Sequence, residues 1–512
     1  MSNPPSEEHK TEKTRGKSLK HLIIQPELLK LIPESTSRKY TAIPLESSGN
    51  VLHVAMANPS DIVALEALAA RSQMHIVTEQ ANAEEIIEAI DFNYQSYEEI
   101  EEQISSFSLD TEEADLQTRL STVTDAPVAR ALALIIDEAV KARASDIHFQ
   151  PQEDKLQVRF RIDGTLHNMI SLPLMTASPL ISRIKVLANM NIADHHRPQD
   201  GQLSVKTRTG QSMDIRVGMI PTVYGEMASL RLLDKSRAVM DLAELGFLSQ
   251  SLEKYNEMLK IPYGMILVSG PTGAGKTTTL YASINGLACT ERNIITIEDP
   301  VEYRFMNINQ IQVNPKAGLT FASGLRSILR LDPDVILVGE IRDAETARIA
   351  IQSALTGHLV LSSIHANDAV GVVFRLIDLG IEPFLVASAL IGVVAQRMVR
   401  RICPDCTQFT EVPLIEQKGY QKETGDERKE FLYGSGCTSC SYTGYYGRTG
   451  LFEILQISDE IRMMLLNGTT TTGLRNQAIK EGMVPLVNDG MLKVKDHLTT
   501  PAEVLRNAYS VD

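Results

Sequence analysis

The sequence predicts an α/β protein built around a mostly parallel sheet, and three observations support this. From Gly264 onward, short apolar runs of the length of buried strands alternate with helix-compatible segments. Between about residues 120 and 235, apolar and polar residues alternate along several segments, which is typical of an antiparallel sheet in an α+β domain. Residues 21–95 mix strand-like and helical runs, and predict a small N-terminal α/β module.

The composition is that of an ordinary globular protein of 512 residues, with 43% hydrophobic residues. The 50 Lys and Arg against 64 Asp and Glu give a net charge of -14, so we expect no nucleic-acid partner held by phosphate neutralisation. The longest apolar run, Phe384 to Ala395, is shorter than the ~20 residues of a membrane span and predicts a buried helix. The polar N-terminus has no apolar signal core, so we expect a cytoplasmic protein.

The N-terminal quarter of the chain has three predicted parts. Residues 1–20 are polar and predict a disordered tail. In the module of residues 21–95, Val51–Met56 is strand-like, Asn58–Asp61 supplies a turn and a helix cap, and Ile62–Arg71 suits a helix. Residues 96–124 form an acidic linker, because eight acidic residues and no Lys or Arg lie between Tyr97 and Asp115. The linker is either a solvated connection or a docking surface for a basic partner.

The second N-terminal domain is predicted over residues 125–238. It begins with an amphipathic helix over Pro127–Arg143. Lys155–Ile162 alternates apolar and polar residues like a half-buried strand, and Asp163-Gly164 follows as a hairpin turn. Further strands are expected over Gln202–Thr207, Ser212–Met219 and Met227–Leu233.

A phosphate-binding loop follows the apolar strand Met265–Val268. The segment from Gly270 to Thr277 matches the pattern G-x-x-x-x-G-K-[ST] completely and leads into a helix-compatible run. Its glycines let backbone N–H groups surround phosphate oxygens, Lys276 is expected to reach the β- and γ-phosphates, and Thr277 is expected to bind Mg²⁺. The predicted ATP-binding residues are Gly270, Pro271, Thr272, Gly273, Ala274, Gly275, Lys276, Thr277 and Thr278.

Two acidic clusters follow the next buried-type strands. Glu298, Asp299 and Glu302 come after the strand-like run Ile294–Ile297, and Glu340 comes after Asp334–Val338. The carboxyl ends of parallel strands meet at the ligand crevice, so both clusters are expected near the γ-phosphate. Glu340 is a candidate to hold Mg²⁺ through water, and Glu298 or Glu302 to orient the attacking water. The sequence leaves open which carboxylate acts as the base, and any one of them could be an exposed strand-end charge.

Two histidines flank a further predicted core strand. His358 and His365 bracket the apolar run between them. Each is either a structural residue or a group that senses the γ-phosphate.

Four of the five cysteines form two C-x-x-C pairs. Cys403 and Cys406 are separated from Cys437 and Cys440 by 30 residues. Four thiolates suit a tetrahedral Zn²⁺ ion and leave no open coordination position, so the predicted role is structural. The alternatives are reduced free thiols or a redox pair.

From about residue 125 to 512, the chain resembles the ATPases of type II secretion and type IV pilus assembly. Thr296–Glu302 is similar to the family's Asp box, Asp332–Asp343 to its atypical Walker B segment and Thr356–His365 to its His box. The cysteine quartet is similar to the family's metal-binding insertion. Four further segments are similar to motifs of the family, namely Ala144–His148, Arg159–Gly164, Pro198–Gly201 and Gly447–Glu453.

The resemblance implies a RecA-like ATPase domain over residues 239–512, with the zinc insertion at about 400–445, preceded by a PAS-like domain. It also implies a homohexamer, in which ATP lies between these two domains and arginines of the earlier domain face the phosphates. Arg161, Arg216 and Arg231 fall on the matching strands. Many relatives carry Arg two places before Pro198, where this chain has His196, with Arg197 next to it.

The resemblance further implies partners at a membrane. Residues 21–95 look like the module that docks such ATPases to an inner-membrane platform protein, beside a cytoplasmic-side assembly protein, so the association with the membrane is peripheral. The predicted function is ATP hydrolysis that powers the assembly of pilin-like subunits, in secretion or in pilus extension. Two alternatives stay open, a DNA-handling RecA-type motor and a non-hydrolysing nucleotide-bound scaffold. A basic stripe facing the pore would favour the first, and Lys276, Glu302 and Glu340 argue against the second.

Overall fold

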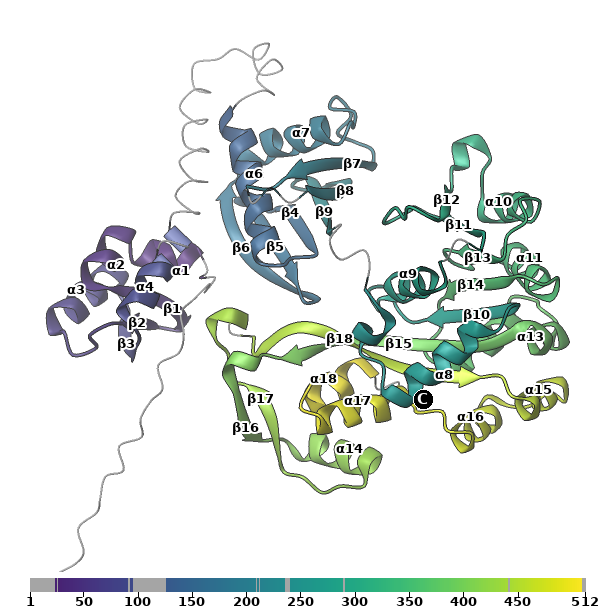
Figure 1. The fold of residues 1–512 in the computed structure, drawn as a ribbon. Coiled ribbons are helices and arrows are strands. Elements are labelled where there is room, and N and C mark those ends of the chain that lie inside the picture. Colours follow the sequence, from purple (N-terminus) through teal and green to yellow (C-terminus); the bar gives the residue numbers. More distant parts are fainter. Residues whose placement is uncertain are drawn as a thin grey trace, which may run out of the picture. The chain divides into compact units, whose positions relative to one another are not determined.

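The computed structural model describes most of the chain, which is drawn in Figure 1. The described residues are 24, 26–90, 93–94, 126–208, 210, 212–234, 240–288, 291–440 and 443–508. The chain divides into two compact units with the main boundary between Leu232 and Leu233. The predicted tail 1–20, the predicted linker 96–124 and the four predicted domain boundaries all fall outside the described residues.

The N-terminal module is a three-stranded sheet with helices. Strand β2 (Val51–Met56) lies in the middle, antiparallel to β1 (Ala42–Ser48) and parallel to β3 (His75–Gln80). Asp61 caps helix α3 (Ile62–Ser72) by accepting a hydrogen bond from the Ala64 N–H group, as its sequence predicts. The other helices of the module are α1 (Pro26–Leu31), α2 (Glu34–Tyr40) and α4 (Ala83–Ile90).

The domain that follows is built on a six-stranded sheet in the order β6-β5-β4-β9-β8-β7. Strand β5 has the bounds that its alternating pattern predicts, and Leu156, Val158 and Phe160 on it are buried. Helix α6 (Ala126–Lys141) and helix α7 (Ala177–Leu187) complete the domain. The strands are β4 (Asp146–Pro151), β5 (Lys155–Ile162), β6 (Thr165–Pro173), β7 (Gln199–Lys206), β8 (Ser212–Thr222) and β9 (Gly225–Asp234).

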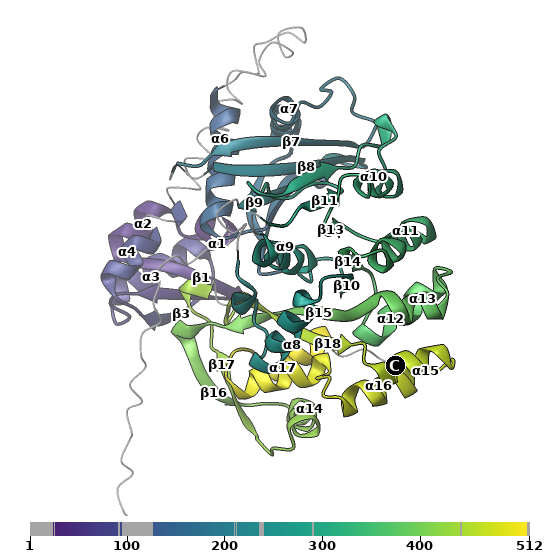
Figure 2. The same cartoon turned by 45° about the vertical axis from the view of Figure 1, so that its right-hand side comes forward.

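The second unit contains a seven-stranded sheet in the order β12-β11-β13-β14-β10-β15-β18. From β11 to β18, its labelled strands follow one another down the sheet in Figure 2. Each neighbour pair from β12 to β15 in this sheet is parallel, and β18 runs antiparallel to β15. The strands are β10 (Gly264–Ser269), β11 (Ile294–Glu298), β12 (Asn309–Gln312), β13 (Val335–Val338), β14 (Leu359–Ile364), β15 (Leu390–Ile402) and β18 (Tyr445–Gln456).

Hydrophobic residues cover both faces of this sheet. Alternate residues of β10 enter different cores, because successive side chains of a strand point to opposite faces. Met265 and Leu267 belong to one core, whereas Ile266 and Val268 belong to the other. The helices of this unit are α8 (Ser249–Lys260), α9 (Lys276–Leu287), α10 (Phe321–Ile328), α11 (Ala344–Leu355), α12 (Ala369–Asp378), α13 (Pro383–Ala389), α14 (Leu414–Thr424), α15 (Asp459–Leu466), α16 (Thr471–Lys480), α17 (Leu486–Lys495) and α18 (Pro501–Ala508).

One prediction about this sheet is wrong. The apolar run from Phe384 to Ala395 is not a single buried helix, because α13 ends at Ala389 and β15 begins at Leu390. Phe384 is 55% exposed. A short apolar run does not distinguish a buried helix from a buried strand, and this run contains one end of each.

Within the described residues, no helix is both long enough and apolar enough to cross a membrane.

Candidate active site

The phosphate-binding loop joins β10 to α9 and is shaped by glycine. Gly270 has φ 149°, and a Cβ atom there would lie 2.4 Å from the backbone oxygen of Gln396 on β15. Gly273 and Gly275 also have positive φ, at 79° and 87°, which favours glycine. The loop therefore packs closely against the sheet and leads into the first turn of α9. The N-terminus of a helix favours a bound anion.

Lys276 lies at the first position of α9 and bends back over the loop. Its Nζ donates to the backbone oxygens of Gly270 (2.8 Å) and Pro271 (3.1 Å). Partial burial lowers the pKa of Lys276, and the negative charge of Glu340 opposes that shift. The neighbouring Thr277 and Thr278 are exposed, so their hydroxyls are open to a ligand. This arrangement offers a cation, two hydroxyls and backbone N–H groups to a bound phosphate.

The first acidic loop begins with Glu298 at the end of β11. Glu298 is 4% exposed, and its carboxylate accepts hydrogen bonds from Thr296 Oγ1 (2.6 Å), Gln310 Nε2 (3.2 Å) and the Tyr281 hydroxyl. Asp299 is exposed and Glu302 is half-buried. Glu298 is therefore held inside the protein by neutral donors, while Asp299 and Glu302 lie further along the loop.

The second acidic loop follows β13 and carries Glu340. Arg342 Nη2 lies 2.5 Å from Glu340 Oε1, and His365 Nε2 lies 3.8 Å from Glu340 Oε2. The Glu340 side chain is 15% exposed, whereas that of Arg342 is 65% exposed. This carboxylate is thus held by an exposed guanidinium group, with the exposed imidazole of His365 near its other oxygen.

Charges from the two acidic loops and the phosphate loop meet at the carboxyl edge of the sheet. Glu340 raises the pKa of Arg342 through its hydrogen bond and its charge, and the charge of Asp299 adds to this effect. Glu340 also acts on the pKa of Lys276. The carboxyl ends of β10, β11 and β13 therefore bring a lysine and acidic groups together, a combination suited to a phosphate ester and a divalent cation.

The two predicted histidines lie at opposite ends of β14. His365 follows the carboxyl end of the strand and approaches Glu340. His358 precedes the amino end, and its Nδ1 lies 2.9 Å from the backbone oxygen of Ser353. Seven steps along the strand, of about 3.3 Å each, separate their backbones by roughly 23 Å. The structure brings His365, and not His358, to the acidic group.

Two residues of β15 contact this region and were not singled out from the sequence. Gln396 is 2% exposed; its Nε2 donates to the backbone oxygen of Ala274 (2.6 Å), and its Oε1 accepts from Thr279 Oγ1 (2.8 Å). Arg397 donates to the backbone oxygen of Asn367 (3.0 Å), and burial lowers its pKa. A signal was present, because these are polar residues inside an apolar strand.

The three predicted arginines share one face of the six-stranded sheet. Asp146 on β4 is the register partner of both Arg161 on β5 and Arg231 on β9. Its carboxylate lies 3.7 Å from Arg161 Nε and 3.2 Å from Arg231 Nε. Arg216 alternates along β8 with the buried Ile215 and Val217, so it faces away from the core as the other two do. Arg197 lies in a loop and its side chain is 84% exposed.

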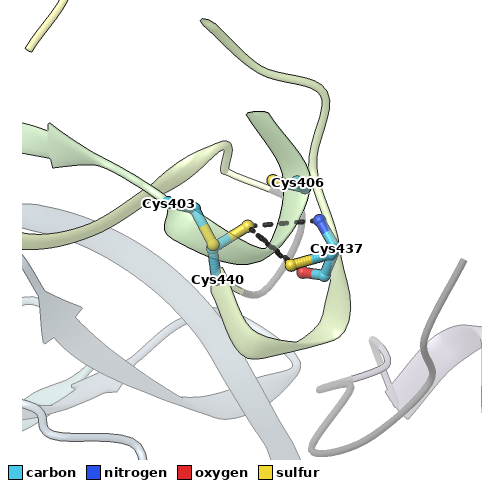
Figure 3. A group of neighbouring side chains, drawn as sticks. All are labelled: Cys403, Cys406, Cys437 and Cys440. Atoms are coloured by element: carbon cyan, nitrogen blue, oxygen red, sulfur yellow. Dashed lines mark hydrogen bonds between the residues drawn. The ribbon is translucent and has the colours of Figure 1, made fainter. Parts of the chain in front are cut away.

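The four cysteines come together as a candidate metal centre (Figure 3). Their Sγ atoms all lie within 4.8 Å of one another, and Cys437 Sγ and Cys440 Sγ are 3.7 Å apart. That separation is too long for a disulfide bond of about 2.05 Å. It is close to the roughly 3.8 Å between two thiolates on a tetrahedral zinc ion with Zn–S bonds of about 2.3 Å.

Backbone groups hold the sulfur of one of these cysteines in place. Cys440 Sγ accepts from the N–H groups of Cys437 (3.2 Å) and Gly444 (3.3 Å) and lies 3.2 Å from the carbonyl oxygen of Cys437. Contacts of this kind orient metal ligands. The four-cysteine cluster therefore fits zinc. It joins the two ends of an excursion that contains β16 (Thr407–Glu411), α14 and β17 (Glu430–Gly434).

Comparisons with known proteins agree with this geometry. Residues 121–506 match the model of the family described as type II/IV secretion system protein, and residues 18–99 match that of the MshEN domain. The type IV pilus assembly ATPase PilB of Myxococcus xanthus is 40% identical over 501 residues, which cover 96% of this chain and 88% of the relative. The type II secretion system protein E of Dickeya dadantii is 42% identical over 492 residues, which cover 94% and 97%.

A solved structure supports the same assignment. The pilus retraction motor PilT with bound ADP is 26% identical, with a TM-score of 0.51 over 73% of this chain and 96% of PilT. The chain therefore belongs to the ATPase family of type II secretion and type IV pilus assembly.

Proposed function

We propose that this protein is a hexameric motor that hydrolyses ATP to drive the assembly of pilin-like subunits. The observation that carries the proposal is the convergence of Lys276, Glu340 and the Asp299–Glu302 loop at one edge of a parallel sheet. The relatives named for type II secretion and for type IV pilus assembly both support the general class of process. Pilus extension and secretion are the two branches in which such a motor acts.

In this proposal, Lys276 and the loop N–H groups hold the β- and γ-phosphates of ATP. Thr277, and Glu340 through water, would hold Mg²⁺, which would neutralise charge on the phosphates. Glu302 orients the attacking water and accepts its proton. The water oxygen bonds to the γ-phosphorus, the bond to the bridging oxygen breaks, and ADP and phosphate leave. Glu298 acts through its neighbours, because its carboxylate already accepts three hydrogen bonds.

Basic side chains of the second N-terminal domain complete the site in the assembled ring. Arg161 and Arg231 present guanidinium groups on one sheet face, and Arg216 lies on the same face. Cations that face the transferred phosphoryl group stabilise the charge of the transition state. We assign these arginines that role, and we assign His365 the sensing of the γ-phosphate through Glu340.

Zinc at the cysteine cluster is structural in this proposal. The four thiolates fill a tetrahedral shell and leave no position for a substrate. Purified protein is expected to contain about one Zn²⁺ per chain. Metal analysis of the purified chain tests this, and a folded, metal-free protein would contradict it.

The N-terminal module docks the motor to an inner-membrane platform protein, beside a cytoplasmic-side assembly protein. Docking through a partner gives a peripheral position at the cytoplasmic face of the inner membrane. Removal of residues 1–95 is expected to leave ATP turnover measurable but to move the protein from the membrane fraction to the supernatant. Unchanged sedimentation with membranes would place the docking surface elsewhere on the chain.

The decisive experiment measures assembly and turnover together. The purified full chain, with Mg²⁺ and ATP, is expected to form hexamers by light scattering and to release phosphate. Addition of DNA is expected to leave the rate unchanged, whereas a DNA-handling motor would be stimulated. A chain that binds ATP without releasing phosphate, as a hexamer, would be a scaffold and would overturn the motor proposal.

A further inference from the structure

Tyr281 connects the phosphate-binding helix to the first acidic loop. It lies on α9, whose first residue is the phosphate-loop lysine, Lys276. Its ring is buried and meets Tyr303 and Phe305 edge-on, with centroid distances of 6.1 and 5.1 Å. These packed aromatic residues fix where the hydroxyl points, because a buried ring has little rotational freedom.

The hydroxyl of Tyr281 contacts the acidic loop at two points. It donates to the carboxylate of Glu298 and accepts a hydrogen bond of 3.1 Å from the backbone N–H of Glu302. A single oxygen atom on α9 therefore contacts both Glu298, where the loop begins, and Glu302, the carboxylate assigned to the water. The Tyr281 hydroxyl is thus a direct polar link from the helix that holds the phosphate loop to the loop that carries Glu302.

The environment keeps Tyr281 protonated and able to donate. Burial raises the pKa of Tyr281, and the negative charge of Glu298 raises it further. On the other side, Thr296 and Gln310 donate to Oε1 of Glu298 while Tyr281 donates to Oε2. The carboxylate is therefore fixed from several directions, and Tyr281 supplies the donor that comes from α9.

We propose that Tyr281 is a positioning residue that sets the place of Glu302 relative to the phosphate loop. A displacement of the first turn of α9 is transmitted through the Tyr281 hydroxyl to the backbone of Glu302. The attacking water is then aligned only when the loop and helix hold the nucleotide. This inference rests on the proposed function, in which Glu302 orients the water.

Tyr281→Phe tests the inference because it removes the hydroxyl and keeps the ring. The chain also offers a matched control on the same helix. The buried Tyr255 makes a 2.7 Å hydrogen bond to Ser283 of α9, and within the described residues its hydroxyl makes no hydrogen bond to the acidic loop. Tyr255→Phe therefore removes a buried hydroxyl that anchors α9 without touching Glu298 or Glu302.

The measurements are kcat, the Kd of a fluorescent ADP analogue and the melting temperature of the full chain. Tyr281→Phe is expected to lower kcat about tenfold to a hundredfold, the range of a hydrogen bond to a charged group. Its Kd is expected to stay within about twofold, because Lys276 and the loop are unaltered. Tyr255→Phe and Tyr281→Phe are expected to lower the melting temperature by similar amounts. Tyr255→Phe is expected to keep kcat within about twofold of the wild-type value. Equal kcat values for the two variants would overturn the inference. A loss of nucleotide binding by Tyr281→Phe in parallel with its loss of kcat would also overturn it.

A double variant separates the link to Glu302 from the loss of a donor to Glu298. Glu298→Gln combined with Tyr281→Phe removes the buried charge that the missing hydroxyl would leave without its donor. On this inference the double variant stays slower than Glu298→Gln alone, since the Glu302 N–H has still lost its acceptor. A double variant as fast as Glu298→Gln alone would overturn the inference. A wild-type rate that Lys276→Ala leaves unchanged overturns the proposed site and this inference with it. A Lys276-dependent rate that Tyr281→Phe leaves unchanged overturns this inference alone.

Discussion

The two acidic loops of the ATPase domain have similar places on the sheet and different surroundings. Each follows a buried parallel strand and begins with a glutamate near the carboxyl edge of the sheet. Glu298 is 4% exposed and is held by a threonine, a glutamine and a tyrosine, all neutral donors. Glu340 is held by the exposed guanidinium of Arg342, with His365 near its other oxygen.

This difference indicates two roles. Glu298 is a fixed part of the site, whereas Glu340 can exchange its partner. Neutral donors inside the protein fix Glu298 in one geometry, and replacing any of them would leave a buried charge with fewer hydrogen bonds. The Arg342 side chain in the ion pair with Glu340 is 65% exposed, and ion pairs screened by solvent contribute about 0–1 kcal/mol. Glu340 can therefore leave Arg342 for a hydrated metal ion at little cost.

The largest effect on ATP turnover is expected at Lys276, the lysine of the site to which both acidic loops belong. Lys276→Ala removes the cation that is assigned to the β- and γ-phosphates, so phosphate release is expected to fall below detection. The exposed Lys316 provides a control, because Lys316→Ala removes a lysine of the same domain away from the loop. Equal ATP turnover in the two variants would show that the phosphates bind elsewhere.

The sequence predicts the frame of this site well, because the frame depends on local patterns. The alternation in Lys155–Ile162 gives a half-buried strand, and the glycines before Lys276 give the loop where positive φ is required. The run Ile294–Ile297 and the acidic residues after it predict a strand end, and β11 ends at Glu298. Each of these features follows from residues that are neighbours in the chain.

The rest depends on contacts between distant residues, which no local pattern contains. Gln396 reaches the phosphate loop from a strand more than a hundred residues later in the chain. The difference between Glu298 and Glu340 comes from Tyr281 and Gln310 on one side and from Arg342 and His365 on the other. The division of Phe384–Ala395 into a helix and a strand comes from β15 pairing with both β10 and β18.

Glu340→Gln is expected to have the next largest effect. The neutral amide keeps the size of the side chain and removes the charge assigned to Mg²⁺, so kcat is expected to fall about a hundredfold, as for other lost electrostatic groups in active sites. The free energy of unfolding is expected to change by less than about 1 kcal/mol, because the Arg342 side chain of the ion pair is exposed and solvent screens the pair. Phosphate-release assays and urea unfolding measure the two quantities.

Glu345→Gln is the matched control for this variant. Glu345 also forms a 2.5 Å ion pair, with Arg326, and its side chain is 60% exposed in the first turn of α11. Its removal is expected to leave kcat within about twofold. If Glu345→Gln were as slow as Glu340→Gln, a general loss of acidic charge would explain the result and the assignment to Mg²⁺ would fail.

Compared with Glu340→Gln, Glu298→Gln is expected to lower stability more and activity less. Its amide cannot accept from Tyr281 in the same way as a carboxylate, so the free energy of unfolding is expected to fall by about 1–3 kcal/mol. The expected loss of kcat is about tenfold, smaller than for Glu340→Gln, because Glu298 acts through its neighbours. The ratio of the two effects distinguishes a positioning carboxylate from one that meets the reactants.

Asp489→Asn controls for the general effect of changing a buried acid. Asp489 is 0% exposed and pairs with Lys493 at 2.5 Å on α17. Asp489→Asn is expected to lower the free energy of unfolding about as much as Glu298→Gln does and to keep kcat within about twofold. A hundredfold loss of kcat in Glu298→Gln, without loss of stability, would instead make Glu298 the base.

The smallest effect is expected at Arg342, where the comparison predicts a gain rather than a loss. Arg342→Gln removes the cation that competes with Mg²⁺ for Glu340, so the Mg²⁺ concentration for half-maximal turnover is expected to fall about two- to fivefold, the factor that corresponds to an exposed ion pair. Arg326→Gln breaks an equally short pair between α10 and α11, whose glutamate is more exposed than Glu340, and is expected to leave the Mg²⁺ requirement unchanged. If Arg342→Gln instead raised that requirement, or lowered kcat more than tenfold, Arg342 would contact the phosphates itself. Glu340 would then be fixed as firmly as Glu298, and the difference between the two loops would disappear.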